Sequence, residues 1–271
     1  MKRQDQAKVA ETHGFGSVLV EIVEWNELRG MADPDGMDRL ALARQAGVAA
    51  RQVRISLSGN DEIVTEAGAL QFHSGKIEIR NEIPAGKILG RLFGAAVTGE
   101  AVFRPSYRGT GEIWLEPTFG HFVVVGLDSE TVIVDQGAFH LAGSGVKVEA
   151  KAQKNLSSAI FGGEGLFQTA LTGPGFCVLQ SKVPESELVK IFVEPGEKCV
   201  VDGSFALLRT ANLDFSVGKS ARGWVGTALS GEGLLSTFEN RSKRQGEVWI
   251  SPLEPIYASF SPRPRPQEKK Q

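Results

Sequence analysis

Three glutamates recur along the chain, and each directly follows a glycine: Glu100, Glu164 and Glu232. Carboxylate oxygens are the ligands that hard divalent cations prefer, so a ring of the three around an axis would be able to hold a cation. In the alternative interpretation, each carboxylate accepts hydrogen bonds from its own turn or pairs with a neighbouring charge. We favour this structural role, because repetition retains what a fold needs, and we expect no metal site and no cofactor.

Two tryptophans, Trp114 and Trp249, stand at corresponding places in the phrases E-I-W-L and E-V-W-I, and Val178 takes that place between them. Aromatic side chains at such positions could stack on a ligand or a base. Tryptophans in strands more often fill a core or a subunit interface. We therefore expect packing rather than recognition at Trp114 and Trp249.

Histidines and cysteines suggest no centre of chemistry. A cupin-type metalloenzyme would need a His-x-His pair with a nearby carboxylate, whereas His73, His121 and His140 stand apart in the sequence. Cys177 and Cys199 have no histidine at a suggestive spacing, so small buried hydrophobic side chains are expected rather than nucleophiles. The chain also contains no Gly-x-Ser-x-Gly elbow and no phosphate loop. We expect a protein that is not an enzyme.

The charge balance argues against nucleic acid as a partner. The chain of 271 residues carries 30 basic and 32 acidic residues, a formal net charge of −2, so no overall field attracts a polyanion. The basic cluster Arg241-Ser-Lys-Arg244 occurs once, in an insertion. A solvated loop is the favoured interpretation, and contact with a phosphate or an acidic partner is the alternative.

The elements that position these residues form a threefold internal repeat. The segments 60–80, 129–150 and 197–217 each place a glycine between an apolar strand and a second, alternating strand, namely Gly68, Gly137 and Gly203. A second glycine follows in each copy: Gly99, Gly163 and Gly231. A positive φ angle or the close approach of another strand is expected at these glycines. Valine at such a position should misfold the unit.

The anchors divide the chain into units 51–117, 118–183 and 184–255, each a meander of short strands. Alternating Val53, Ile55 and Leu57 predict one face for a core and one for solvent. Phe122–Val125 and Lys190–Val193 have little polar interruption and should be buried on both faces. We predict an all-β fold, with the three copies in a closed pseudo-threefold arrangement that removes sheet edges.

The ends of the chain differ from the repeats. Residues 1–50 form an N-terminal extension with a flexible start over 1–15, a strand over 17–25 and one short helix over about 36–46. Asp33 suits the N-cap, Pro34 the first helical position and Gly47 the end of this helix. Proline and charge predict a disordered tail over 258–271.

The chain contains no apolar run of transmembrane length and no apolar stretch typical of a signal peptide near its start. We therefore predict no membrane span and a cytoplasmic location. Peripheral association with a membrane stays open.

Four phrases carry a resemblance to a known family: GEIWLEP at 111–117, GGEGLFQTALTGPGFCVLQS at 162–181, SGEGLLSTFEN at 230–240 and GEVWISPLEP at 246–255. Together they resemble the AIM24 family, named for altered inheritance of mitochondria, over residues 51–257. The resemblance implies a fold similar to the tryptophan RNA-binding attenuation protein, a short double-stranded β-helix or β-sandwich, triplicated in one chain. It also implies a trimer or a related oligomer, and eukaryotic members are tied to the organisation of the mitochondrial inner membrane.

Two hypotheses of different classes follow. The leading one is a non-enzymatic, homo-oligomeric scaffold or interaction protein, with a trimer favoured and its protein partners unknown. The alternative is a module that binds a small ligand or RNA in grooves between repeats or subunits. RNA binding by the fold relative depends on repeated basic positions, and no basic triplet recurs with the repeat here.

Overall fold

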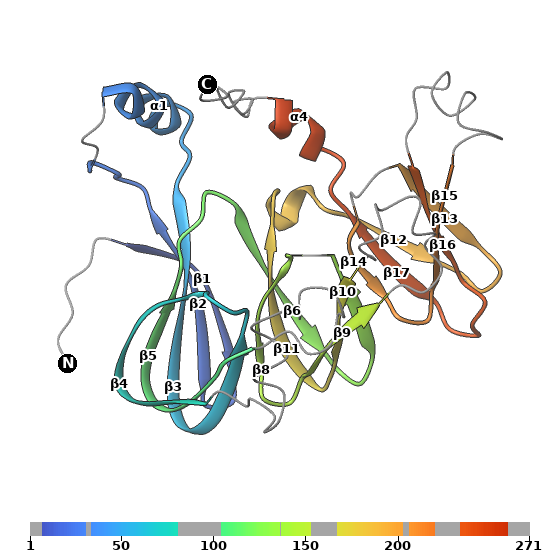
Figure 1. Cartoon of the computed structure of the whole chain (residues 1–271), viewed down its shortest axis with the longest axis horizontal. Helices are drawn as coiled ribbons and strands as arrows, with labels where there is room; N and C mark the ends of the chain where they lie inside the picture. The colour runs from blue at the N-terminus through green and yellow to red at the C-terminus, as the bar shows by residue number, and fades with distance from the viewer. Residues whose placement is uncertain are drawn as a thin grey trace, which may run out of the picture.

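The computed structural model describes residues 7–30, 34–80, 104–135, 137–152, 167–202, 206–219 and 234–259. These residues form mainly antiparallel strands, which confirms the all-β prediction at the level of fold class. The strands gather into three groups that follow one another along the long axis of the molecule, from the N-terminal side to the C-terminal side (Figure 1).

The first group of strands pairs in the order β1-β2-β3-β5-β4. Its members are β1 (Lys8–Phe15), β2 (Val18–Trp25), β3 (Ala50–Thr65), β4 (Leu70–Arg80) and β5 (Ser106–Leu115). The expectation that residues 1–15 are flexible is wrong from Lys8 onward, because β1 pairs along its length with β2. Most side chains of β1 are exposed, so backbone pairing rather than an apolar face holds this strand.

The second group contains six strands, which pair as two sets of three. In each set, one strand lies between the other two. Its members are β6 (His121–Leu127), β7 (Thr131–Val134), β8 (Phe139–Gly143), β9 (Lys147–Ala152), β10 (Phe167–Thr172) and β11 (Gly175–Ser181). The last strand, β11, lies between β6 and β8. The fifth strand, β10, lies between β7 and β9.

The third group has the same pairing order as the second. Its members are β12 (Val189–Val193), β13 (Lys198–Asp202), β14 (Ala206–Thr210), β15 (Asp214–Lys219), β16 (Leu234–Glu239) and β17 (Gly246–Ile250). Here β17 lies between β12 and β14, and β16 lies between β13 and β15. A short 3₁₀ turn, η1 (Glu185–Glu187), precedes the group.

In the first group, β3, β4 and β5 are long, and each takes the place of two short strands in the other groups. The first half of β3, which ends at Ser58, pairs with the end of β5, and the second half, from Glu62, pairs with the start of β5. β4 lies on the other side of β5 along its whole length. The order of strand halves is therefore the order found in the other two groups.

Neighbouring groups join through shared sheets. The second half of β3 pairs with β8, so that Thr65 faces Leu141, and β7 pairs with β14, so that Val134 faces Leu208. At both junctions the second strand of one group meets the third strand of the next. Backbone hydrogen bonds, and not only side-chain packing, thus connect the three groups.

A β-bulge recurs in the third strand of every group. One extra residue stands between Leu70 and Phe72, whose partners on β5 are adjacent. The extra residue is His140 in β8 and Leu207 in β14. A bulge increases the local twist and redirects the side chains beside it, so the three third strands share this local irregularity.

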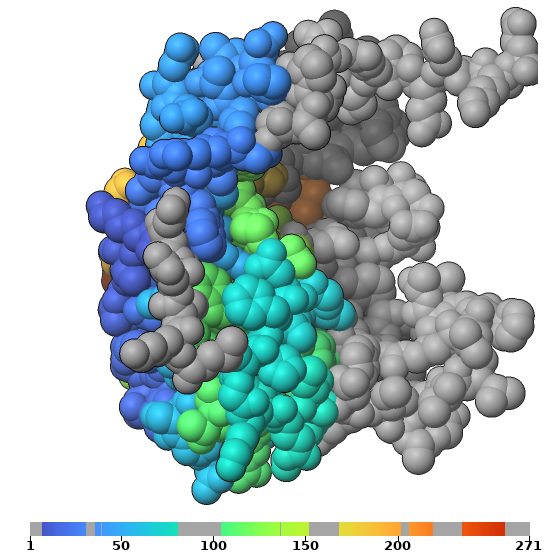
Figure 2. All heavy atoms as spheres, turned by 90° about the vertical axis from the view of Figure 1, so that its left-hand side faces the viewer, coloured from blue at the N-terminus to red at the C-terminus, as the bar shows by residue number. Residues whose placement is uncertain are grey.

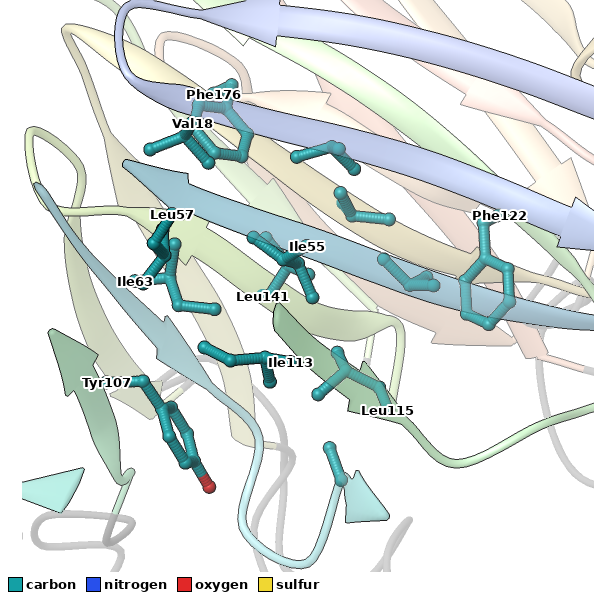
Figure 3. Packing of buried hydrophobic residues seen from close by; sticks show 14 of the residues in the cluster. Val18, Ile55, Leu57, Ile63, Tyr107, Ile113, Leu115, Phe122, Leu141 and Phe176 are labelled. Carbon is teal, nitrogen blue, oxygen red and sulfur yellow. The ribbon is translucent and has the colours of Figure 1, made fainter. Parts of the chain in front are cut away.

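Three apolar clusters form the interior, one for each group. In the first cluster Ile55, Ile113 and Leu141 point into the same space from β3, β5 and β8 (Figure 3). Val53, Ile55 and Leu57 are all buried, as their alternation predicts. Leu141 belongs to the second group, so the first cluster extends across the junction.

Two burial expectations were wrong. Arg54 alternates with the buried residues of β3 and was expected in solvent, but it is only 9% exposed. Lys190–Val193 was expected to be buried on both faces, whereas Phe192 is 55% exposed. β12 is the outer strand of its sheet, and one face of an outer strand often lies open to solvent.

Two α-helices lie among the described residues. α1 (Pro34–Gln45) begins at the predicted proline and ends just before Gly47, whose φ is +70°; Asp33 lies outside the described residues. α4 (Glu254–Ser259) continues into the segment predicted to be a disordered tail, of which residues 260–271 are not described. Neither helix has the length and apolar character needed to cross a membrane.

Candidate functional site

The two ends of the row of groups expose sheet edges, and we call these the terminal edges: residues 70–74 of β4 and residues 198–202 of β13. Within the described residues, β4 pairs with β5 alone and β13 pairs with β16 alone. Each terminal edge carries an exposed apolar side chain, because Phe72 is 47% and Val200 is 48% exposed. Open edges with apolar side chains favour pairing with another chain.

An aromatic cluster lies directly behind the β4 edge. Phe72 stacks on Trp114, with ring centroids 5.5 Å apart and an angle of 15° between the rings, and the Trp25 ring centroid lies 6.4 Å from that of Trp114. The guanidinium of Arg54 sits 5.4 Å from the Trp114 ring centroid. Figure 2 shows β4, in cyan, on the outer surface of this end of the molecule. The cluster holds Phe72 in place at the edge.

Polar groups beneath this cluster are satisfied by one another. Arg54 donates from Nε to Glu21 Oε2 at 2.5 Å, and both side chains are about a tenth exposed. The buried amide of Gln52 accepts a hydrogen bond from Trp25 Nε1 at 3.0 Å and donates to Gln71 Oε1 at 2.6 Å. These partners fix the orientation of the aromatic rings, since buried polar groups are strongly directional.

A cleft of about 410 Å³ lies between the second and third groups. Asp135, Gly137, Lys182 and Glu254 are among the residues that line it, and Lys182 forms an ion pair with Glu254. On one wall, Thr118 Oγ1 accepts hydrogen bonds from the backbone of Gly120 at 2.9 Å and from the Gln180 amide at 3.2 Å. Its size and its few charged side chains would admit a small polar molecule.

The predicted anchor residues divide into described and undescribed ones. Gly68 and Gly137 occupy tight turns with φ of +81° and +78°, and no atom lies within 4 Å of an added Cβ at either. The positive φ, and not a close neighbour, is what requires glycine there. The remaining anchors and the glutamates lie outside the described residues: Gly99, Gly163, Gly203, Gly231, Glu100, Glu164 and Glu232.

Both predicted tryptophans face inward. Trp114 and Trp249 are 2% and 8% exposed, and Val178 between them is fully buried. Trp249 donates from Nε1 to Glu247 at 3.0 Å, and the Lys190 ammonium lies 3.9 Å from its ring centroid. Rings that are buried to this extent offer a ligand little surface on which to stack.

The histidines are dispersed in the structure as in the sequence. His73 is exposed on β4 and His121 is half-buried. His140 is buried against the Phe122 ring, and burial lowers its pKa to about 4. Its Nε2 finds no hydrogen-bond partner within the described structure, so the neutral imidazole serves as a packing group.

Both cysteines are thiols. Cys177 is buried, and burial raises its pKa to about 12, while half-buried Cys199 has a pKa raised by burial. Such thiols are weak nucleophiles near neutral pH. Over the described ranges, no group of three or more His, Cys, Asp or Glu side chains comes together to hold a metal ion.

In the basic insertion of the third group, Arg241 pairs its charge locally. Arg241 donates to Glu239 Oε2 at 2.7 Å and lies 3.6 Å from Asp214. Fully buried Asn240 donates to the carbonyls of Val193 and Arg244 at 2.7 and 2.8 Å. The loop is therefore held to the body of the group, with Arg241 neutralised on its surface.

Sequence reasoning missed the residues that matter most at the terminal edges. Phe72 sits in an alternating strand and Val200 in a short apolar run, and only a comparison with Leu141 and Ile133 at corresponding places would have marked them. Glu21 carried one available signal, because it interrupts the apolar run Val18–Val23, whereas Arg54 occupies an ordinary polar position of an alternating strand.

Comparisons with known proteins agree with the fold. The sequence profile of a family described as "Mitochondrial biogenesis AIM24" matches residues 44–253. The crystal structure of a Streptococcus pyogenes protein from a structural genomics consortium superposes with a TM-score of 0.58 at 23% identity, covering 78% of this chain and 93% of that chain. No curated protein matches the sequence. At this identity the structural similarity concerns the fold alone.

Proposed function

This chain belongs to the AIM24 family, and from that premise we propose that it is a non-catalytic, homo-oligomeric scaffold of β-sheet units. The family description refers to mitochondrial biogenesis; for this chain we propose a cytoplasmic location. The role of the scaffold is to present a repeated surface to other macromolecules.

The proposal includes a repeat: each group of strands is one copy of a six-strand unit, of the kind found in the tryptophan RNA-binding attenuation protein. Three observations support it. The pairing order recurs in all groups, the bulge recurs in all third strands, and both junctions join second strand to third strand in one register. In the first unit the hairpin of β1 and β2 is an addition beside β3.

One observation carries the scaffold proposal: the units are connected by sheet pairing and, among the residues that the structure describes, end in unpaired edges. A sheet junction is rigid and repeatable, because its register is set by backbone hydrogen bonds. An array of units built on such junctions is suited to assembly. The oligomer that we favour is a trimer.

Light scattering coupled to size-exclusion chromatography tests this function. We expect a mass of at least two chains at micromolar concentration, with three chains as the favoured stoichiometry. A single-chain mass that persists as the concentration is raised to 100-fold the starting value would overturn the proposal.

A second candidate function, binding of a small polar ligand, is favoured by the cleft between the second and third groups. Its lining of Asp135, Lys182 and Glu254 offers both signs of charge. Thermal-shift measurements with tryptophan, nucleotides and short RNAs test it, with Lys182→Ala as the matched variant. Stabilisation of the wild type that the variant loses would support this function, and no stabilisation by any of them would count against it.

A further inference from the structure

We propose that the two terminal edges pair with each other between copies: β4 of one chain adds antiparallel to β13 of a second chain. This inference rests on the proposed scaffold function, for which it names the partner and the contact. The junctions inside the chain provide the template, because each joins the same two strands of successive units.

The template has a fixed register. Thr65 faces Leu141 at the first junction and Val134 faces Leu208 at the second. Leu141 and Leu208 are also the residues that follow the bulge in their own third strands. The residue that follows the bulge in β4 is Phe72.

The flanking backbone bonds are the same at both junctions. At one end, the amide of Glu66 donates to His140 O at 2.9 Å, and the amide of Asp135 donates to Leu207 O at 3.0 Å. Both acceptors are the bulge residues. In β4 the bulge residue is Gln71.

The other end of each junction is closed in the same manner. The amide of Ser144 donates to Glu62 O at 2.9 Å, and the amide of Ala211 donates to Thr131 O at 2.8 Å. Two bonds of fixed position at the ends, with three facing residue pairs between them, define a junction without freedom to slip.

β13 has the sequence needed for the missing half of a junction. Its residues Cys-Val-Val-Asp at 199–202 correspond to Val-Ile-Val-Asp at 132–135 of β7. Val201 thus takes the place of Val134. Applying the template register, Phe72 of one chain faces Val201 of another, His73 faces Val200, and Ser74 faces Cys199.

Apolar side chains that are buried at the junctions are exposed at the corresponding places on the terminal edges. Leu141 and Leu208 are 0% and 3% exposed, whereas Phe72 is 47% exposed. Ile133 is 1% exposed, whereas Val200, its counterpart in β13, is 48% exposed. Pairing the two edges would remove both apolar side chains from water, which stabilises the contact.

The partner must be a second copy. Figure 1 places β4 at one end of the molecule and β13 at the other, so one chain cannot pair its own two edges. The contact is of the head-to-tail type, in which different patches meet. Repetition of a head-to-tail contact closes into a ring or continues as a filament.

A single cysteine substitution tests the register. In an antiparallel pair, backbone hydrogen bonds form at every second residue, and here the bond at Gln71 sets the pattern. Ser74 and Cys199 are therefore a non-hydrogen-bonded pair, with about 4.5 Å between their Cα atoms. This spacing suits a disulfide. We expect Ser74→Cys to form, on mild oxidation, a disulfide to Cys199 of a second copy, recovered as a linked peptide by mass spectrometry.

His73→Cys is the matched control, because its side chain points to the opposite face of the strand. Its thiol should stay unlinked to Cys199, and Cys199→Ser should abolish the link formed by Ser74→Cys. Cys177 is fully buried and takes no part. Equal linking at positions 73 and 74 would overturn the proposed register.

Val200→Lys tests the edge without cross-linking. We expect it to reduce the apparent mass to one chain in light scattering, while the melting temperature of the isolated chain and its circular dichroism stay those of a folded protein. If the oligomer persists in Val200→Lys and Ser74→Cys forms no link to Cys199, this inference is wrong, while the scaffold function is not contradicted. A wild type that is a single chain overturns the scaffold function itself.

Discussion

Phe72 and Leu141 each lie opposite the last strand of their own group, Phe72 against Trp114 and Leu141 against Val178, yet Phe72 is 47% exposed and Leu141 is fully buried. The difference comes from the neighbour on the other side. β8 has β3 beside it, whereas β4 has no second strand partner among the described elements. The same local design is thus buried inside the chain and open at its end.

Burial of His140 should make stability depend on pH. Its pKa is about 4 in the folded chain and 6.5 in an exposed imidazole, so the unfolded chain takes up the proton first as the pH falls. The contribution of His140 to the free energy of unfolding is fully present above pH 6.5 and is lost as the pH falls towards 4. Between pH 7 and pH 5 we expect a loss of about 2 kcal/mol from this residue in urea unfolding.

His140→Leu is the matched variant, because leucine stands at the corresponding bulge position, Leu207. It should remove that part of the pH dependence. His121, whose pKa is lowered by burial and by Arg51, contributes with the same sign in both proteins. Parallel stability curves for wild type and variant would contradict the assignment to His140.

Loss of the partner of Arg54 should destabilise the first group. Glu21→Gln leaves the guanidinium buried without its carboxylate, and breaking a buried pair costs about 3 kcal/mol. Replacement of both residues, Glu21→Gln with Arg54→Met, should recover part of the loss. Glu78→Gln in the exposed pair with Arg80 is the control, with no measurable change expected in the urea midpoint.

Gly68→Ala should lower stability through the backbone alone. No atom lies within 4 Å of the added Cβ, but a φ of +81° costs an L-residue about 1–2 kcal/mol. Asparagine at the same place should cost less, since it visits this region more readily. Gly126→Ala, at an equally open position without a positive φ, should show no loss, and an equal loss there would refute the backbone explanation.

Trp114→Val distinguishes packing from recognition. Valine is the residue that the second group carries at this place, but the surroundings of Trp114 are built for an indole, so we expect a loss of about 3 kcal/mol. Chemical denaturation measures it, with Phe72→Ser as a variant at the exposed side of the stack. Unchanged stability would contradict the packing role of Trp114.

Glycines and alternation predicted much of the fold, because both signals are local. Gly68 and Gly137 mark turns whose positive φ angles require glycine, and Pro34 marks the start of a helix. Phrases that recur around Trp114 and Trp249 predicted which strands correspond, and these strands hold corresponding places in the pairing of their groups.

What the sequence could not provide depends on partners distant along the chain. β1 has polar residues on both faces and is a strand because β2 offers it backbone partners. Arg54 is buried because Glu21, 33 residues earlier, is placed beside it by the pairing of β2 with β3. The bulge at His140 likewise has no signature of its own, since an inserted residue is visible only against the strand opposite.

The two terminal edges are unlike in sequence, which gives the molecule a polarity. A copy that carries Val200→Lys retains a normal β4 edge, so it can accept a neighbour at one end and offer nothing at the other. Mixed in small amounts with wild-type chains, it is expected to stop the addition of further copies at that end. Two defective copies, one altered at Phe72 and one at Val200, would each block a different end of the assembly. Comparing the ends that they block would therefore give the direction of assembly.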